Sequence, residues 1–176
     1  MFTKQGDSRD KVNIKLITLY SLLTAICLIV GYLENVLSIG LISIAPGVKV
    51  GLSNAVALTL IYSGNKKAAW AVNITRICLS ALLFGSPISF VLSICGGLAS
   101  TTLATVLYSV KSVSVIGTSI ASGVTHNLFQ LLAASVITGW GVVYYSPILV
   151  VMGAVCGAVC GVLAKTLGDK IKKLEI

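Results

Sequence analysis

The chain has 176 residues, of which 56% are hydrophobic and only 10% are charged. Its mean hydropathy of +1.00 is far above that of a soluble domain, and apolar runs of about 18 residues or more recur along its whole length. These features predict an all-α polytopic membrane bundle and leave no room for a separate soluble domain. The net charge of +8 does not indicate nucleic-acid binding, because the basic residues are divided among tails and short loops.

Six transmembrane helices are expected in chain order. They cover residues 12–33, 50–62, 68–83, 88–110, 113–137 and 148–167, so that residues 12–167 form one transmembrane domain. A short basic arm, residues 1–11, precedes this domain, and a basic tail, residues 168–176, follows it. The connection over residues 36–48 is apolar for a loop, and we expect it to fold back against the bundle.

The distribution of lysine and arginine predicts the orientation of these helices. The arm, the turn after the second helix, the turn after the fourth helix and the tail are basic, whereas the loops after the third and fifth helices contain no lysine or arginine. The positive-inside rule therefore places both termini in the cytoplasm. Trp140 and Tyr144 then fall at the outer interface, where aromatic side chains with a polar atom are favoured. The first apolar stretch is too long for the apolar core of a signal peptide, so we expect a multi-pass protein of the cell membrane.

The cysteines do not predict a metal site or a disulfide framework. No CxxC pair is present, and all five cysteines lie within expected spans: Cys27, Cys78, Cys95, Cys156 and Cys160. We interpret them as small packing residues, and we expect no metal and no cofactor.

Two basic residues, Lys49 and Arg76, do not fit the loop pattern. A cation near hydrocarbon costs several kcal/mol unless it faces water or a partner, so such a residue indicates a functional site. Arginine does not lose its proton, and Arg76 must therefore be solvated or paired. A buried anionic ligand would satisfy both requirements.

Polar residues within the spans share helix faces. Asn73 and Arg76 lie on one side of the third helix, and the fifth helix presents Ser119, Ser122, His126 and Gln130 on one side with Asn127 next to them. We predict a substrate-binding pocket that opens to the exterior and is formed by Glu34, Asn35, Lys49, Asn54, Asn73, Arg76, His126, Asn127 and Gln130. Two cations against one carboxylate favour a small anionic ligand, such as a carboxylate, a phosphate or a diphosphate.

Structural roles for the same residues are the alternative. Arg76 would then pair with Glu34 inside the bundle, and Lys49 would extend into the lipid headgroups. His126 and the amides would join helices by hydrogen bonds. The convergence of these residues on the outer half of the membrane favours the binding site. No catalytic triad, Walker A motif or HExxH motif is present, and we expect no enzyme.

Small residues on two helices are candidates for helix docking. Gly153, Gly157 and Gly161 are four residues apart in the sixth helix, and the first helix has Ser21 and Ala25. Such faces let backbones approach closely in lipid. Packing within the bundle is the favoured interpretation of the glycines, and docking of another membrane protein is the alternative.

Two segments carry a family resemblance. Residues 46–54, PGVKVGLSN, resemble the P-G-x-K-x-G-L-x-N signature of the Gx transporter family, and residues 126–130, HNLFQ, resemble its H-N-x-x-Q segment. The resemblance extends over essentially the whole chain. This family also carries the older label heptaprenyl diphosphate synthase component I.

The family is similar to the S components of energy-coupling-factor (ECF) vitamin transporters. Those six-helix proteins capture a small molecule outside the cell and dock to a membrane coupling subunit with two ATPases. The resemblance therefore implies these partners and a role in ATP-driven uptake. Ser21-x-x-x-Ala25 stands where that group has an A-x-x-x-A docking motif.

The older label suggests a second function. Prenyl diphosphate synthases bind Mg²⁺-diphosphate through aspartate-rich motifs, but the aspartates of this chain are Asp7, Asp10 and Asp169, all in the tails. The chain would then be an accessory subunit of a prenyl synthase or of a quinone-pathway enzyme. A self-sufficient carrier or channel is a third interpretation, which the lack of evident repeat symmetry and of a mid-membrane coupling carboxylate disfavours.

Overall fold

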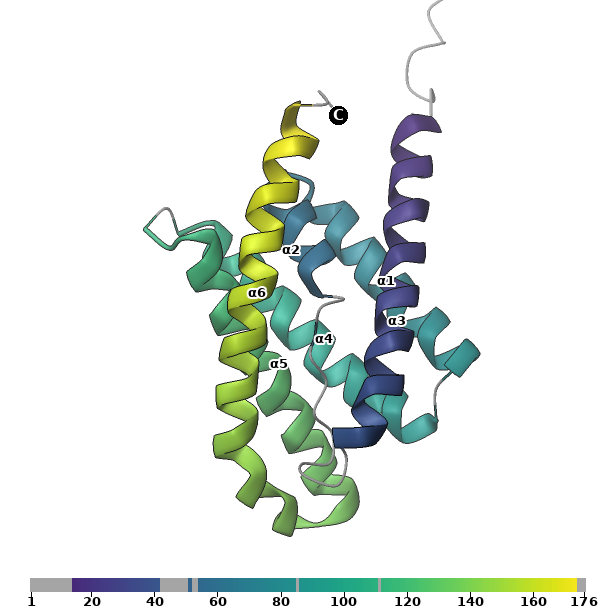
Figure 1. Cartoon of the computed structure of the whole chain (residues 1–176), viewed down its shortest axis with the longest axis vertical. Helices are drawn as coiled ribbons and strands as arrows, with labels where there is room; N and C mark the ends of the chain where they lie inside the picture. The colour runs from purple at the N-terminus through teal and green to yellow at the C-terminus, as the bar shows by residue number, and fades with distance from the viewer. Residues whose placement is uncertain (1–13, 42–50, 52–53, 85, 111, 174–176) are drawn as a thin grey trace, which may run out of the picture.

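A computed structural model describes residues 14–41, 51, 54–84, 86–110 and 112–173 (Figure 1). Its elements are α1 (Ile14–Leu41), α2 (Asn54–Tyr62), α3 (Lys66–Phe84), α4 (Pro87–Tyr108), α5 (Val115–Thr138), the 3-10 helix η1 (Trp140–Tyr145) and α6 (Ser146–Lys173). The described part of the chain contains no strand, which confirms the all-α prediction.

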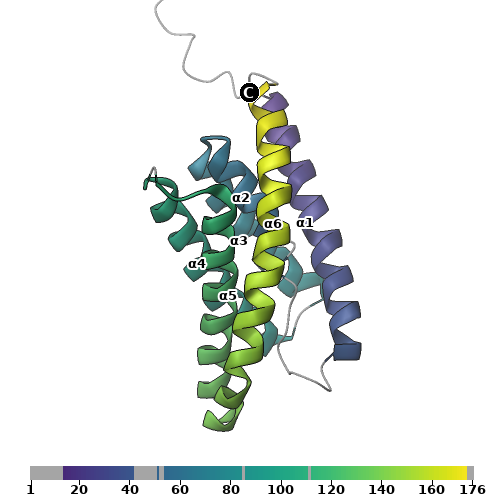
Figure 2. The ribbon, with the colours of Figure 1, turned by 60° about the vertical axis from the view of Figure 1, so that its left-hand side comes forward.

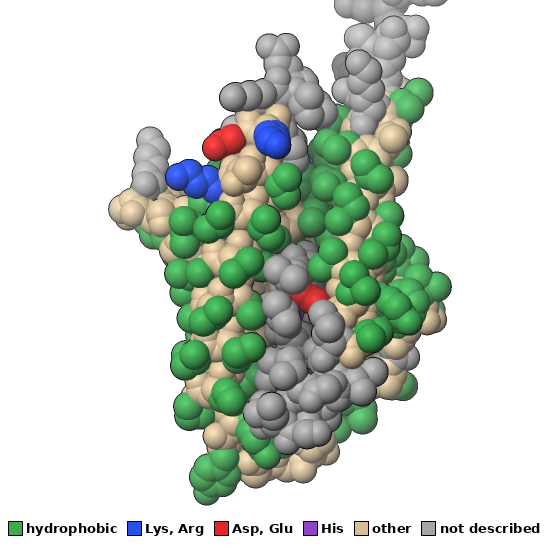
Figure 3. Space-filling model, in the orientation of Figure 1, with side chains coloured by type: hydrophobic (Ala, Val, Ile, Leu, Met, Phe, Trp, Pro, Cys, Tyr) green, Lys and Arg blue, Asp and Glu red, His purple; other side chains and the backbone are tan. Residues whose placement is uncertain are grey.

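Five of the described helical stretches are long and apolar enough to cross a membrane, which confirms the polytopic helix bundle. They are Leu16–Glu34, Lys66–Phe84, Pro87–Tyr108, Val115–Thr138 and Trp140–Lys170. The start of α1 and the end of α6 lie at the same end of the bundle (Figures 1 and 2). Hydrophobic side chains cover the visible sides of α1 and α6, and the lysines seen in that view lie near the last turns of α6 (Figure 3).

The second helix differs from the prediction. A crossing over residues 50–62 was expected, but α2 begins at Asn54 and has nine residues. At 1.5 Å per residue it is about 13 Å long, less than half of a hydrocarbon core of about 30 Å. Its residues from Ala55 to Ile61 are all buried. α2 therefore fills the interior of the bundle and does not span it.

Two further boundaries also differ. α1 continues to Leu41, past the Glu34-Asn35 pair at which its end was expected. Glu34 is only 4% exposed, so this polar residue turns toward the bundle instead of starting an aqueous loop. α6 continues to Lys173, so residues 168–173 of the expected tail are helical. The expected arm and residues 42–48 of the expected apolar loop lie outside the described residues.

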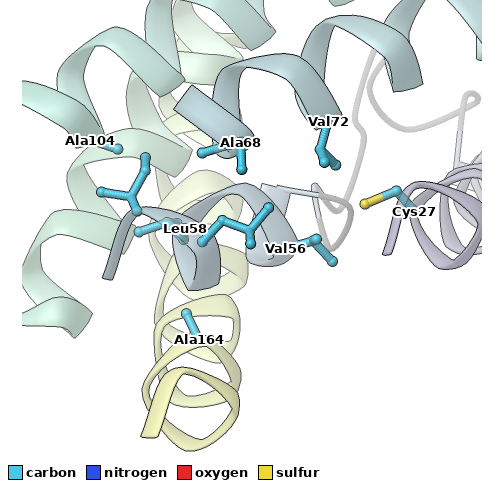
Figure 4. Close-up of a cluster of buried hydrophobic side chains, with 10 residues drawn as sticks. Cys27, Val56, Leu58, Ala68, Val72, Ala104 and Ala164 are labelled. Carbon is cyan, nitrogen blue, oxygen red and sulfur yellow. The ribbon is translucent and has the colours of Figure 1, made fainter. Parts of the chain in front are cut away.

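A cluster of small and branched side chains surrounds α2 (Figure 4). Val56 and Leu58 of α2 meet side chains from four other helices, namely Cys27 of α1, Ala68 and Val72 of α3, Ala104 of α4 and Ala164 of α6. Because most of these partners are small, long helices can approach α2 from several sides.

The glycines of α6 pack against α5. A Cβ atom on Gly157 would lie 2.7 Å from the carbonyl oxygen of Ser119, and one on Gly153 would lie 2.9 Å from that of Gly123. A Cβ on Gly161 would meet the Cα atom of Ile116 at 2.9 Å. These contacts agree with the favoured interpretation of Gly153, Gly157 and Gly161, packing within the bundle, because α5 covers this face of α6.

A glycine pair in α4 lets neighbouring helices approach closely on two sides. A Cβ on Gly96 would lie 2.9 Å from the carbonyl oxygen of His126 in α5. A Cβ on Gly97 would lie 2.7 Å from the Cδ1 atom of Ile77 in α3. α4 is therefore a central helix against which α3 and α5 both pack closely, and this packing brings their polar faces together.

Candidate functional site

A charged cluster, formed by Glu34, Asn73, Arg76 and Thr101, joins α1, α3 and α4. Arg76 Nη2 donates a hydrogen bond to Asn73 Oδ1 at 2.9 Å. Asn73 Nδ2 in turn donates to Thr101 Oγ1 at 2.8 Å and to the carbonyl oxygen of Gly97 at 3.2 Å. Asn73 is 2% exposed, and its amide thus orients the guanidinium of Arg76 and is itself fixed to α4.

Glu34 of α1 supplies the negative charge of this cluster. Its carboxylate is buried and lies within range of electrostatic interaction with Arg76. The same carboxylate is within electrostatic range of Cys156 and Cys160 of α6. An intramembrane charge is stable only beside water or a partner, and Glu34 is the carboxylate whose charge acts on Arg76 from α1.

A second group, the histidine cluster, is formed by Asn54, Ser100, Ser119, Ser122 and His126. The Nδ1 atom of His126 lies 3.3 Å from Asn54 Nδ2 of α2 and 3.4 Å from Ser100 Oγ of α4. With the Asn54 amide in this orientation, its nitrogen donates and Nδ1 accepts, so a neutral ring carries its proton on Nε2. His126 thereby links α2, α4 and α5.

A narrow cavity of about 20 Å³ lies beside the histidine cluster. Its wall includes Asn54, Ser119, Ser122 and His126 and the thiols Cys156 and Cys160 of α6. The hydroxyl oxygens of Ser119 and Ser122 are buried and have no hydrogen-bond partner among the described residues. This volume is enough for about one water molecule, and the site is polar enough to bind one. The cavity therefore offers neutral hydrogen-bonding groups, and no described charged residue lines it.

The comparison with family models identifies the chain. The model described as heptaprenyl diphosphate synthase component I matches residues 23–167. The chain belongs to the heptaprenyl diphosphate synthase component I family. No curated protein and no solved structure matches it. The range matched by this family contains both clusters, from Glu34 in α1 to the α6 residues beside the cavity.

In this family member, most of the predicted site residues that the structure describes fall into two groups. Asn73 and Arg76 come together with Glu34, and Asn54 comes together with His126. The two groups meet at α4, where the adjacent residues Thr101 and Ser100 contact one group each. The side chain of Asn35 and the whole of Lys49 lie outside the described residues.

Within the described part of the chain, Asn127 and Gln130 form no hydrogen bond with either cluster. Asn127 Nδ2 donates to the carbonyl oxygen of Leu149 at 3.0 Å and so links α5 to α6. Gln130 is buried behind Gly96, and its Nε2 atom has no hydrogen-bond partner among the described residues. The structure thus gives Asn127 a role in joining helices, which was the alternative interpretation for the amides.

Sequence reasoning missed two hydroxyl side chains of the site, Ser100 and Thr101. Neither residue was among the predicted site residues. The available signal was their position one helical turn after Gly96-Gly97, since a glycine pair lets neighbouring helices approach the hydroxyls on the same faces.

Proposed function

We propose that this family member is the substrate-binding, S-component-like subunit of an ECF-type transporter in the cell membrane. It captures a small anionic molecule from the exterior, and partner subunits drive uptake with ATP. The observation that supports this function is the burial of two polar clusters from α1 to α5 inside an otherwise apolar membrane bundle. Such groups are costly in lipid and mark substrate pathways.

The ligand chemistry follows from the two clusters. Arg76 has a planar guanidinium that suits bidentate contact with a carboxylate or phosphate, and Asn73 fixes its direction. Asn54, His126 and the serine hydroxyls contribute neutral hydrogen bonds to the rest of the molecule. In this proposal Lys49, which belongs to the P-G-x-K-x-G-L-x-N segment, adds a second cation. The chain binds its ligand and does not transform it.

The proposed docking face lies on α1. Ser21 and Ala25 are exposed, and they lie on the side of α1 opposite to the buried Cys27. Small residues at this spacing let a helix of a membrane coupling subunit approach closely. The sequence contains no Walker A motif, so the energy for transport comes from two ATPases bound to that coupling subunit.

The family description favours a second candidate, a non-catalytic membrane subunit of a heptaprenyl diphosphate synthase. Residues 23–167 contain no aspartate, so the matched region supplies no aspartate-rich site for Mg²⁺-diphosphate. The chain would then anchor or assist a separate catalytic subunit at the membrane.

An affinity pull-down from native membranes in mild detergent, with mass spectrometry of the partners, separates the two candidates. Recovery of a membrane coupling subunit with two ATPases is the expected result. Recovery of a prenyl synthase subunit without ATPases would contradict the transport proposal and support the second candidate.

The role of Arg76 is tested on the same material. Small molecules that copurify with the chain are compared between wild type, Arg76→Ala and the control Lys67→Ala, whose side chain is exposed at the start of α3. Arg76→Ala should lose an anion that wild type and Lys67→Ala both retain. Equal retention by all three proteins would remove Arg76 from the site.

A further inference from the structure

The cavity beside the histidine cluster lies between α2 and α5, and we call this space the α2–α5 slot. α2 makes far fewer close backbone contacts with α5 than with α6. Side chains at both ends of α2 bridge the distance instead. Asn54 Nδ2 lies 3.3 Å from Nδ1 of His126, and the hydroxyl of Tyr62 donates to Thr118 Oγ1 at 2.8 Å. These contacts therefore connect α2 to α5 at both ends and leave the cavity between them.

The two walls of the slot differ in chemistry. The apolar residues Ala57, Leu58 and Ile61 line it from α2, and Ser119 and Ser122 line it from α5. Ser119 is 1% exposed and Ser122 is 4% exposed, and neither hydroxyl oxygen has a hydrogen-bond partner among the described residues. A buried hydroxyl without a partner is costly. Two such hydroxyls that face one cavity therefore indicate a place that receives a polar group.

Size and charge limit the group that the slot accepts. The cavity of about 20 Å³ has room for about one water molecule, and so for one non-hydrogen atom with its hydrogens. No described charged residue lines it, and an ion without a counter-charge is costly to bury. Each serine hydroxyl both donates and accepts hydrogen bonds. A hydroxyl group fits these conditions, because it is uncharged, has the size of water, and also donates and accepts.

The slot reaches the charged cluster through α4. Thr101 lines the cavity, and its Oγ1 atom accepts a 2.8 Å hydrogen bond from Asn73 Nδ2. The Oδ1 atom of the same amide accepts the 2.9 Å bond from Arg76 Nη2. Along this route only two side chains, Asn73 and Thr101, separate the guanidinium from the slot. A ligand with two different polar groups thus has a cation for one of them and neutral hydroxyls for the other.

We propose that the α2–α5 slot binds a hydroxyl group of the ligand, and that the ligand is a small hydroxylated anion whose charged group binds Arg76. The proposal rests on the transport function above. The ligand hydroxyl bonds to Ser119 and Ser122, which the chain itself leaves without described partners. An anion of the same shape without the hydroxyl should bind about tenfold more weakly, the order of magnitude for the loss of one hydrogen bond.

The test uses the native thiols Cys156 and Cys160, which line the slot, in a background in which the other three cysteines are replaced by alanine. Two uncharged reagents of equal length, hydroxyethyl and propyl methanethiosulfonate, react with the full chain in nanodiscs, and mass spectrometry gives the rate at each thiol. The propyl reagent ends in a methyl where the other has a hydroxyl. The ratio of the hydroxyethyl rate to the propyl rate should fall about tenfold in the double variant Ser119→Ala/Ser122→Ala.

Ser135→Ala is the matched control. Its hydroxyl is buried in the same helix but donates to the carbonyl oxygen of Leu132, and it does not line the slot. This variant should keep the wild-type ratio, and circular dichroism shows that both variants are folded. The same ratio in wild type and in the double variant would overturn the proposal. Thiols that react with neither reagent would also overturn it, because a ligand hydroxyl would then not reach the slot.

The ligand class and the transport function are tested separately. The anion that wild type retains and Arg76→Ala loses should carry a hydroxyl, and an anion without one would overturn the proposed class. A lowered ratio in the double variant together with recovery of a prenyl synthase subunit would reject the transport function and retain the hydroxyl-binding slot. An unchanged ratio together with recovery of the coupling subunit would reject the slot alone.

Discussion

α1 and α6 are both 28 residues long and apolar, and they flank the bundle on different sides, yet they are attached in opposite ways. α6 lies along α5 with glycine backbones in direct contact, as at Gly123 and Gly153. α1 meets α3 through a buried thiol, an aromatic pair and a charge. Since hydrophobicity does not drive helices together in lipid, close packing and polar attraction are the two remaining means. The comparison teaches that α6 is held by close backbone packing, whereas α1 is held to the described helices by a few side-chain contacts.

The same division separates the two parts of the proposed transport mechanism. The hydroxyls beside the cavity belong to α4 and α5 and are held in the closely packed half. The proposed docking residues Ser21 and Ala25 belong to α1, which has fewer contacts with the other described helices than α6 has. The proposal therefore places the binding site and the docking surface in differently packed parts of the bundle.

The largest expected effect is the difference in stability between a glycine-to-alanine substitution in α6 and one in α1. Gly157→Ala in α6 places a Cβ atom 2.7 Å from a backbone oxygen of α5, and it should destabilise the protein by about 3 kcal/mol. Gly31→Ala in α1 meets no atom within 4 Å and should be neutral or stabilising by up to about 1 kcal/mol. Unfolding of the detergent-solubilised protein, followed by circular dichroism, measures both. Equal losses would show that α1 and α6 are not attached differently.

The next effect concerns Asn73, which links Arg76 of the charged cluster to α4. Asn73→Ala removes the amide that links Arg76 to α4 and should destabilise the protein by about 2 kcal/mol, because it deletes three hydrogen bonds, one of them to a charged group. The same unfolding measurement applies, with Thr75→Ala on the exposed side of α3 as the control. If Asn73→Ala unfolds like the control, the bonds of Asn73 do not hold Arg76 to α4.

A smaller effect is expected for a hydrogen bond on the closely packed side. Asn127→Ala removes the bond to the carbonyl oxygen of Leu149, and the stability should fall by about 0.6 kcal/mol, the average for such bonds between membrane helices. The reason is that the glycine contacts between α5 and α6 remain. A loss as large as that of Gly157→Ala would mean that polar bonding, not close packing, fixes α6.

The smallest effect is expected at the cavity. Ser122→Ala removes a hydroxyl with no partner among the described residues, so the stability should change by no more than about 0.5 kcal/mol. Tyr62→Phe, which breaks the 2.8 Å bond to Thr118, is the positive control and should give a measurable loss. A Ser122→Ala variant as unstable as the control would show that the hydroxyl is bonded in the folded protein, for example to a buried water.

The sequence predicted the middle of the chain well. The third to fifth helices were expected at residues 68–83, 88–110 and 113–137, and they run over Lys66–Phe84, Pro87–Tyr108 and Val115–Thr138. Turn residues such as Ser63-Gly64-Asn65 and Ser86-Pro87 end and start these helices through local chemistry, which a sequence carries directly. The errors at α1 and α2 arose where burial overrides local polarity, at Glu34 and at the all-buried α2.

For the candidate site, the sequence predicted a set of residues but not which of them contact one another across helices. Helical spacing correctly put Asn73 with Arg76, since that spacing depends on one helix alone. The contact between Asn54 and His126 joins residues 72 positions apart, and no local pattern predicts it. The separation into a charged cluster and a histidine cluster, with Thr101 and Ser100 of α4 between them, required the positions of all the helices.

The sequence by itself determined that this is an all-helical membrane protein, because hydropathy and charge act on each segment independently of the others. It also determined which polar residues are too costly to bury without a partner. Only the tertiary structure decided which residues partner the buried polar groups. It also decided that α5 covers the glycines of α6, whereas α1 has few contacts with the other described helices. Those outcomes depend on which helix faces meet, and side chains far apart in the chain compete for the same neighbours in space.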